Sequence, residues 1–370
     1  MTEPTPSAKP LSFLDLVAVV DNFRVGPLPP HAKSFKTEEL VPWALSPDPS
    51  APIIGLLRAP IVQQLIAENS SIPDAEKDKR PWYIDPLSSE DSSLGRRRIS
   101  FAGWVNTPSK RTNVMRSLCE RWRDTGLWSD IVGPKKWRGE DYPVYRNPIG
   151  SNDAPLKEED SGEDERDTRN YAFRMERAAC ALFGVVTYGV HMTVYVDSPD
   201  DKGEKSIWVP KRAKTKQTWP GYLDNSVAGG IPAGLKPFEA LVKEAMEEAS
   251  IEEDIVRRLA KCTGSISYFF CTKDGWLQPE VEYLYEMRVP AELAEDPRYQ
   301  PKPHDGEVES FELLPLSEVE NKMRAGLFKP NCAGALLDFL IRHGLLTPDN
   351  EPDFLEIQTR LRGRFDYERW

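Results

Sequence analysis

The sequence predicts an α/β sandwich in the second half of the chain, preceded by a smaller α+β amino-terminal domain. The chain has 370 residues, whereas single domains commonly have about 100 to 200. Residues 151–170 carry eight acidic side chains, three basic ones and almost nothing to bury, as expected of a solvated linker or long loop. We therefore assign residues 1–150 to the first domain, residues 171–346 to the second and residues 347–370 to a carboxyl-terminal tail.

The first domain mixes helical and strand signals. Thr107 suits a helix cap and Pro108 a first helical position, so we expect a helix that runs to about Thr125 and is closed by Gly126. No catalytic motif accompanies these elements. The other regular segments are two with helix-like apolar spacing, residues 11–23 and 59–69, and a strand-like one, residues 96–105.

The second domain begins with segments that are dense in β-branched and aromatic residues, a composition typical of strands. A glycine-rich turn from Ala228 to Gly234 then precedes a helix, for which Pro237 is well placed at the first position. Further strands follow, and helices begin at Ser317 and at Asn331. The expected strands are residues 179–190, 192–197, 206–212, 265–272, 280–290 and 311–315.

Composition and charge exclude several classes of protein. A hydrophobic content of 39% indicates a globular chain, and the net charge of -11 argues against broad binding to nucleic acid or anionic membranes. The opening residues lack a signal-peptide pattern, and no apolar stretch of about 18 residues could cross a bilayer. The five cysteines lack a CxxC pair, so neither a disulfide framework nor a zinc site is indicated. We expect a cytoplasmic protein, with organelle import open, whose partner is a small molecule; the oligomeric state does not follow.

Residues 228–251 carry the chemistry. Glu244, Glu247 and Glu248 stand at positions i, i+3 and i+4, so on a helix they share one face. Carboxylates this close repel one another, and a divalent cation offsets the repulsion; hard oxygen donors suit Mg²⁺ or Mn²⁺. Taken alone, such a triplet is also typical of a solvated acidic helix face. The surrounding residues decide between the two interpretations.

This segment resembles the Nudix box, which reads G, five residues, E, seven residues, R-E-U-x-E-E-x-G-U, where U is a bulky apolar residue. Gly229 falls on the first position, Glu244 on the first core glutamate, and Glu247 and Glu248 on the glutamate pair. The resemblance implies an α/β/α sandwich with a mixed sheet. It also implies that these glutamates hold the catalytic metal, with Glu247 and Glu248 taking part in catalysis.

Four positions depart from the box. Leu235 replaces the outlying glutamate, Lys243 the arginine, Ala245 a larger apolar residue and Ser250 the glycine. Lys243 keeps a positive charge one turn before Glu247. Leu235 removes a carboxylate, and Ser250 lacks glycine's tolerance of positive φ. An active enzyme and a catalytically silent ligand-binding or regulatory module are therefore both open.

A basic cluster precedes the box. Positive side chains beside a metal site neutralise phosphate charge that the metal leaves exposed. We expect Arg212 and Lys216, together with Gly229 and Gly230 of the box loop, to bind the substrate; a solvated strand end is the alternative. The cluster consists of Lys211, Arg212, Lys214 and Lys216.

Nearly the whole chain resembles a narrower group, the two-domain Nudix proteins of fungi and plants that are related to thiamine pyrophosphokinase. The resemblance implies a diphosphatase that acts on thiamine diphosphate or its damaged oxo and oxy analogues and releases the monophosphate. The amino-terminal domain would help to select the substrate, and Trp208, Trp219 or Trp276 would stack on a cationic thiazolium ring, with core packing as the alternative for each. The segments that carry the resemblance are residues 219–234, 243–251, 278–290, 305–319 and 328–344.

The attacking water needs a base from outside the helix. Strand alternation puts Glu280 and Glu282 on one face, and Glu307 follows a turn expected at Asp305 and Gly306. We favour Glu307 as the base, because a residue beside a turn can approach bound substrate, and Glu280 second; solvent exposure is the alternative for each. An isopentenyl-diphosphate-isomerase-like reaction ranks last, because no cysteine lies beside the box in sequence.

Overall fold

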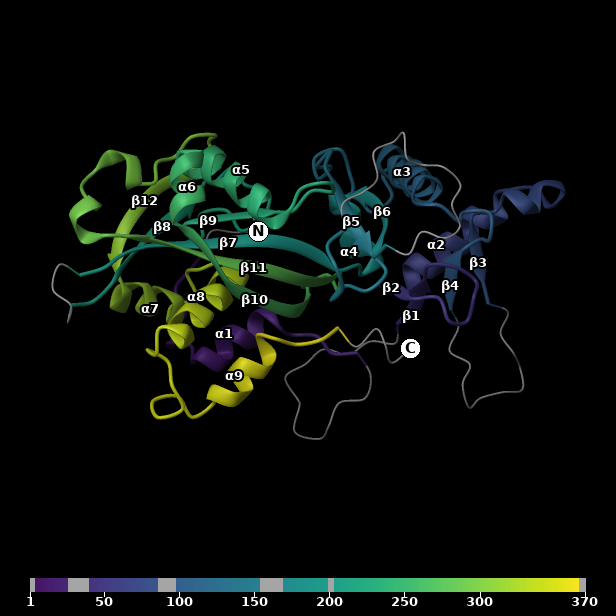
Figure 1. Ribbon diagram of the computed structural model, residues 1–370. Helices are drawn as coiled ribbons and strands as arrows, with labels where there is room; N and C mark the ends of the chain where they lie inside the picture. The colour runs from purple at the N-terminus through teal and green to yellow at the C-terminus, as the bar shows by residue number, and fades with distance from the viewer. Residues whose placement is uncertain (1–3, 26–39, 86–97, 154–168, 199–202, 366–370) are drawn as a thin grey trace.

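A computed structural model describes residues 4–25, 40–85, 98–153, 169–198 and 203–365. Within these ranges the chain forms a small amino-terminal unit and a larger sandwich, which lie at opposite ends of the molecule in Figure 1. Most of the stretch expected to be a linker falls outside the described residues. No helix in the described ranges is both long and apolar enough to span a membrane.

The amino-terminal unit is built on a four-stranded sheet whose order is β2-β1-β4-β3. The predicted helix is confirmed as α3, Pro108–Thr125, with Thr107 as its cap and Gly126 in the left-handed conformation at its end. Large aromatic side chains such as Trp43, Phe101 and Phe183 fill the core. The remaining elements are β1 (Val41–Ala44), β2 (Ile53–Leu57), α2 (Ala59–Ser70), a 3-10 helix (Asp74–Lys79), β3 (Trp82–Ile84) and β4 (Ile99–Phe101).

The boundary of this unit lies later than expected. Strand β5 (Asp141–Tyr145) pairs antiparallel with β6 (Tyr171–Glu176), which follows the acidic stretch. The next residues form a 3-10 turn (Arg177–Ala179) and α4 (Cys180–Phe183), so the beginning of the segment predicted as strand 179–190 is helical. These elements contribute to the same core as Trp43, so the described part of residues 171–183 packs with the amino-terminal unit.

The sandwich is centred on a mixed sheet, as predicted. Its order is β10-β11-β7-β8-β12, and β9 pairs with β7 off this path. Strands β11 and β7 are parallel, whereas the other pairs are antiparallel. The strands are β7 (Thr187–Val196), β8 (Ser206–Arg212), β9 (Val227–Gly230), β10 (Ala260–Cys271), β11 (Leu277–Val289) and β12 (Val308–Pro315).

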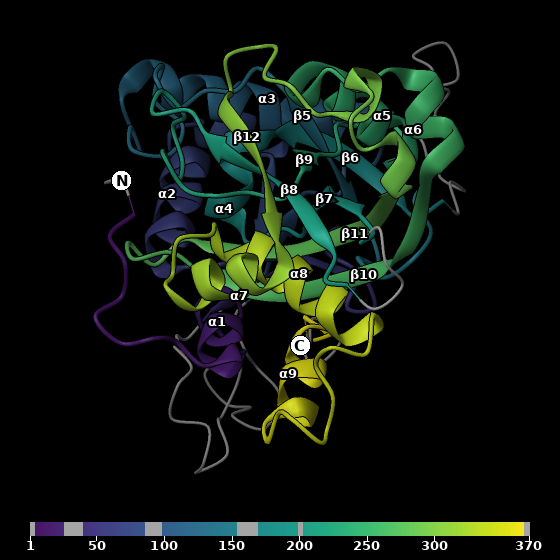
Figure 2. The ribbon, with the colours of Figure 1, turned by 90° about the vertical axis from the view of Figure 1, so that its left-hand side faces the viewer.

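Helices cover both faces of this sheet (Figures 1 and 2). Helices α5 (Pro237–Ala249) and α6 (Glu253–Leu259) pack through one apolar cluster, which includes Val190, Met192 and Val194 of β7. A second cluster joins the other face to the remaining helices. Those helices are α1 (Phe13–Val20), α7 (Leu316–Arg324), α8 (Pro330–Arg342) and α9 (Phe354–Arg360).

Both ends of the described chain belong to the sandwich. Helix α1 packs against α8 and α9, and the carboxylate of Asp21 accepts a hydrogen bond from Nε of Arg360 at 3.2 Å. The residues assigned to the first domain and to the tail therefore contribute to the second core. The sandwich is thus closed by segments that lie at opposite ends of the sequence.

Candidate active site

The site is built where β9 meets α5. Strand β9 pairs with β7, with Val190 opposite Gly229 and Gly189 opposite Gly230. The stretch expected to be wholly a turn therefore begins as a strand. Pro237 starts α5 as predicted, and the helix buries an apolar face that includes Ala240 and Ala245, which leaves its carboxylates free to face β9 and solvent.

Two glutamates of α5, Glu244 and Glu248, are largely buried. Glu248 is 8% exposed, and its Oε2 accepts a hydrogen bond of 3.5 Å from the backbone N–H of Ala228. Burial and, next, the negative charge of Asp224 raise the pKa of Glu248 to about 7. Burial also raises the pKa of Glu244. Both groups bear a charge at an electrostatic cost, which a bound cation would offset.

Glu247 is half-exposed and lies next to Lys243. The Nζ atom of Lys243 lies 2.8 Å from Oε2 of Glu247 and 3.5 Å from Oε1 of Glu244. The contact with Glu247 was expected from the spacing, and the lysine also bridges to Glu244. Where the family has arginine, this lysine neutralises the helix face with a single point charge.

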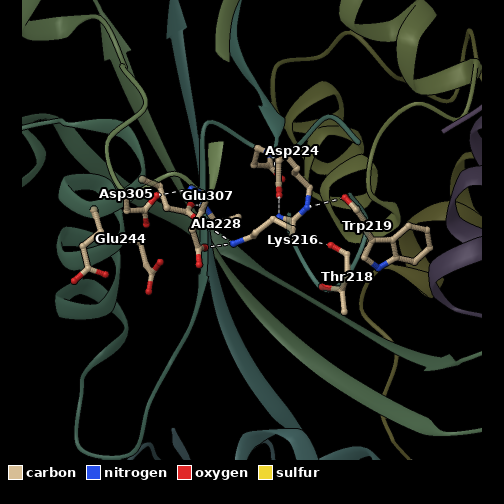
Figure 3. A network of polar contacts seen from close by, with 12 residues as sticks. Lys216, Thr218, Trp219, Asp224, Ala228, Glu244, Asp305 and Glu307 are labelled. Carbon is tan, nitrogen blue, oxygen red and sulfur yellow. Dashed lines mark hydrogen bonds and ion pairs between the residues drawn. The ribbon is translucent and has the colours of Figure 1, made fainter. Parts of the chain in front are cut away.

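Lys216 links the helix to a second acidic segment. Its Nζ atom lies 3.8 Å from Oε1 of Glu248 and forms an ion pair with the carboxylate of Glu307. Figure 3 shows the Lys216 side chain extending from its loop toward Ala228 and Glu307, with Glu244 on the helix beyond. The turn before Glu307 is confirmed, because Gly306 has φ +84° and the Glu307 N–H donates to Asp305. Lys216 and Glu307 thus lie at the carboxylate cluster.

Arg212 has a different position from the one expected of a substrate ligand. Its side chain is buried and forms an ion pair with Asp224. Its Nε and Nη2 atoms donate to the backbone oxygens of Trp219 and Thr218, each at 3.0 Å. The guanidinium therefore anchors the loop that presents Lys216, and only 8% of the side chain is exposed.

Glu280 and Glu282 share one strand face, as predicted, but Glu282 is buried. The Tyr268 hydroxyl oxygen lies 2.5 Å from Oε2 of Glu280 and 2.9 Å from Oε1 of Glu282. A single hydroxyl hydrogen serves only one of these acceptors, so one carboxyl holds its own proton. Burial and the charge of Glu282 raise the pKa of Glu280. Of the two carboxyls, Glu280 is therefore the one whose charged form burial and its neighbour disfavour.

His191 holds the other carboxyl in its ionised form. Burial by itself raises the pKa of Glu282, yet the nearby His191 lowers it below the ordinary value. The Nε2 atom of His191 lies 3.6 Å from Oε1 of Glu282, and Nδ1 lies 2.7 Å from Oδ1 of Asn225. The sequence analysis did not identify His191, and its only signal was a polar residue within an apolar strand.

The aromatic candidates differ in position. Trp276 is buried in the amino-terminal core, where it packs against Trp128 with ring centroids 5.3 Å apart. Trp208 is half-buried beside the sandwich core. Trp219 lies in the loop anchored by Arg212 and contacts Tyr222. Packing accounts for Trp276, and Trp219 is the candidate closest to the basic loop.

The carboxylates do not form a ready-made metal centre. In the described ranges, no three His, Cys, Asp or Glu side chains are gathered closely enough to hold an ion. The donor chemistry nevertheless suits a cation, because Lys243 already bridges Glu244 and Glu247 with a positive charge. A divalent cation held by Glu244, Glu247 and Glu248 would supply further positive charge at these carboxylates.

A loop, a helix with three carboxylates and a mixed sheet between helices together define a domain of the Nudix class. Residues 188–332 match the family model described as NUDIX domain. The chain belongs to the Nudix hydrolase family, whose members cleave phosphoanhydride bonds, and the predicted fold and enzyme class are confirmed.

Three relatives illustrate this membership. An uncharacterized protein of Saccharomyces cerevisiae is 38% identical over 267 residues, which cover 70% of this chain and 69% of that protein. Nudix hydrolase 20 of Arabidopsis thaliana, named as chloroplastic, is 40% identical over 52% of this chain and 48% of its own length. Nudix hydrolase 24 of the same plant, also named as chloroplastic, is 38% identical over 51% and 49%. The chain thus spans about half the length of the two plant relatives.

Proposed function

We propose that this protein is a metal-dependent diphosphatase that cleaves the phosphoanhydride bond of thiamine diphosphate, or of its damaged oxo and oxy analogues, to give the monophosphate and phosphate. The observation that carries the proposal is the pairing of buried Glu248 with Lys216 at 3.8 Å, beside Glu244 and Glu307. The glutamates suit a divalent metal ion, and the positive charge of Lys216 suits a phosphate. Both lie beside β9.

Glu244, Glu247 and Glu248 would hold Mg²⁺ or Mn²⁺. The metal, when bound, neutralises phosphoryl oxygens and favours attack by water. Lys216, which lies beside Glu248 and Glu307, would contact a phosphoryl oxygen, while Gly229 and Gly230 let the substrate approach the backbone closely. Arg212 supports this arrangement indirectly, because it fixes the loop from Thr218 to Trp219.

The organic part of the substrate would lie on the side of the basic loop. Trp219 offers an indole face there, and an indole attracts a cationic ring such as thiazolium. The proposal of a thiamine compound rests on the resemblance of the whole chain to the thiamine-related group. We also propose a cytoplasmic location.

The proposal is tested by phosphate release from the full chain. Thiamine diphosphate, its oxo and oxy analogues and a set of nucleoside diphosphates are compared with Mg²⁺, with Mn²⁺ and with chelator. We expect Glu244→Gln and Glu248→Gln to lower turnover by about a hundredfold or more, because the amide is a weak, neutral metal ligand. Glu239→Gln is a matched control, because Glu239 lies on the same helix but pairs with Arg257 at 2.6 Å. Equal turnover in all three variants would contradict the assignment.

A catalytically silent module is the second candidate. Leu235 stands where the family has a glutamate, so this position offers no carboxylate. The leucine is 39% exposed. A silent module would bind diphosphates but release no phosphate from any of them, with either metal. Metal-dependent release from any compound of the set excludes it.

A further inference from the structure

Arg177 is held in place by the amino-terminal unit. It follows β6, and its backbone N–H donates to the backbone oxygen of Glu140 at 2.8 Å. Its Nη1 atom donates to Oε2 of Glu140, also at 2.8 Å. Its Cζ atom lies 5.0 Å from the centroid of the Tyr142 ring. The carboxylate of Glu140, just before β5, and the Tyr142 ring on β5 thus fix the guanidinium, which reduces the entropy lost when it binds an anion.

This guanidinium lies against the box loop. A Cβ atom on Gly230 would lie 1.4 Å from the hydroxyl oxygen of Tyr142 and 3.4 Å from Cζ of Arg177. Gly230 therefore lacks a side chain where the amino-terminal unit approaches β9. The positive charge of Arg177 acts on the carboxylates of both Glu244 and Glu280. Arg177 thus belongs to the same electrostatic site as the box.

Part of the Arg177 guanidinium remains available. Its side chain is 40% exposed, and in the described ranges its Nε and Nη2 atoms donate no hydrogen bond. A guanidinium edge with free N–H groups matches two oxygens of a phosphate. The contact with Glu140 occupies Nη1, so the free groups are those beside Nε.

Arg177 and Lys216 flank the carboxylate pair of α5. Lys216 lies 3.8 Å from Glu248. Arg177 lies against Gly230, and the preceding Gly229 lies against Glu244, one helical turn earlier on α5. A diphosphate has two charged phosphoryl groups, and two cations at the two ends of this pair would hold one group each. The sandwich supplies Lys216, and the amino-terminal unit supplies Arg177.

We propose that Arg177 is a phosphate-binding residue of the active site, so that the amino-terminal unit completes the diphosphate site of the sandwich. The proposal rests on the proposed diphosphatase function for the identity of the ligand. It gives the amino-terminal unit a direct part in substrate binding, through a residue outside the Nudix box.

The test measures the affinity of the full chain for inorganic pyrophosphate by calorimetry in the presence of Mg²⁺. We expect Arg177→Gln to weaken binding by about tenfold or more, because a charge-assisted bidentate contact is lost. Arg177→Lys should weaken it less, because the charge stays and the fork is lost. Arg123→Gln is the control, since Arg123 lies 4.5 Å from the Trp137 ring centroid and pairs with Asp124 at 2.7 Å. It should bind as the wild type does.

Wild-type affinity in Arg177→Gln would overturn the inference. If Arg177→Gln fails to fold, the pyrophosphate affinity of Arg177→Lys tests the inference instead. An affinity equal to that of the wild type would also overturn the inference. The two proposals fail separately. If the wild type binds pyrophosphate and Arg177→Gln weakens that binding, but no diphosphate is hydrolysed, the proposed function alone is contradicted. If the wild type hydrolyses a diphosphate, but Arg177→Gln has the same pyrophosphate affinity and the same KM as the wild type, this inference alone is contradicted.

Discussion

Gly229 and Glu244 touch so closely that a Cβ atom on the glycine would lie 2.2 Å from Cδ of the glutamate. A side chain at Gly229 on β9 would therefore force the Glu244 carboxylate on α5 to move. We expect Gly229→Ala to displace the Glu244 carboxylate and to lower turnover by about a hundredfold, because small displacements of positioning groups are costly. Gly103→Ala is the control, since a Cβ there meets nothing within 4 Å. Steady-state kinetics of both variants check the prediction, and a fully active Gly229→Ala enzyme would contradict it.

Ser250 ends α5 in the left-handed conformation, with φ +54° and ψ +27°. The family has glycine here, and a serine Cβ is strained in this region, at a cost of about 1 to 2 kcal/mol. Glycine loses more backbone entropy on folding, which offsets part of that gain. We expect Ser250→Gly to raise the free energy of unfolding by about 0.5 to 1 kcal/mol in a denaturant titration. A lower denaturation midpoint would show that the serine is not strained.

Glu248 should destabilise the metal-free protein above neutral pH. Its pKa of about 7 lies above the ordinary glutamate value, so the unfolded state releases the proton first as the pH rises. Protonation of Glu248 therefore contributes fully to the free energy of unfolding below about pH 4. This contribution, up to roughly 3 kcal/mol, is lost as the pH rises through about 7. A neutral glutamine avoids the loss.

With chelator present, Glu248→Gln should therefore unfold at a higher temperature than the wild type at pH 8, and the difference should shrink at pH 5. Thermal unfolding at the two pH values checks this. The same variant loses a proposed metal ligand, so it should also show less stabilisation by added Mg²⁺. A variant that is less stable than the wild type at pH 8 without metal would contradict the prediction.

The box helix and its carboxylate face followed from the sequence because their signals are local. The spacing of Glu244, Glu247 and Glu248 requires only a helix, and Pro237 marks where that helix begins. The positions of Arg177 and Tyr142 did not follow, since they reach Gly230 from the 3-10 turn after β6 and from β5, far away in the sequence. No short-range pattern records such a contact.

Burial of polar residues was also hidden from the sequence. The alternation of β11 placed Glu280 and Glu282 on one face but did not show whether that face meets solvent. Gly189 makes room for the carboxylate, because a Cβ there would lie 2.1 Å from Oε2 of Glu282. Arg212 was expected to bind substrate because it belongs to a basic cluster near the box, and the sequence did not show its partner Asp224, which lies twelve residues later, across a loop.

Two residues are candidates for the base that activates the attacking water: Glu307, just before β12, and Glu280, on β11. Glu307 is half-exposed, follows a turn and contacts Lys216 at the carboxylate cluster. Glu280 instead shares the Tyr268 hydroxyl with Glu282, and burial and the charge of Glu282 raise its pKa. We therefore propose Glu307 as the base.

Glu307→Gln should lower kcat by about a hundredfold or more with little change in substrate affinity, because a general base acts mainly in the transition state. It should also remove the acidic limb of the pH profile, since the amide does not titrate. Glu280→Gln keeps the shape of the side chain at a position that we do not assign to the base, and it should keep most of the activity. The kcat of each variant, measured from pH 5 to pH 9 with saturating substrate, separates the two residues. If Glu307→Gln matches the wild type while Glu280→Gln is inactive, the base lies on β11 and the buried carboxyl pair performs the proton transfer.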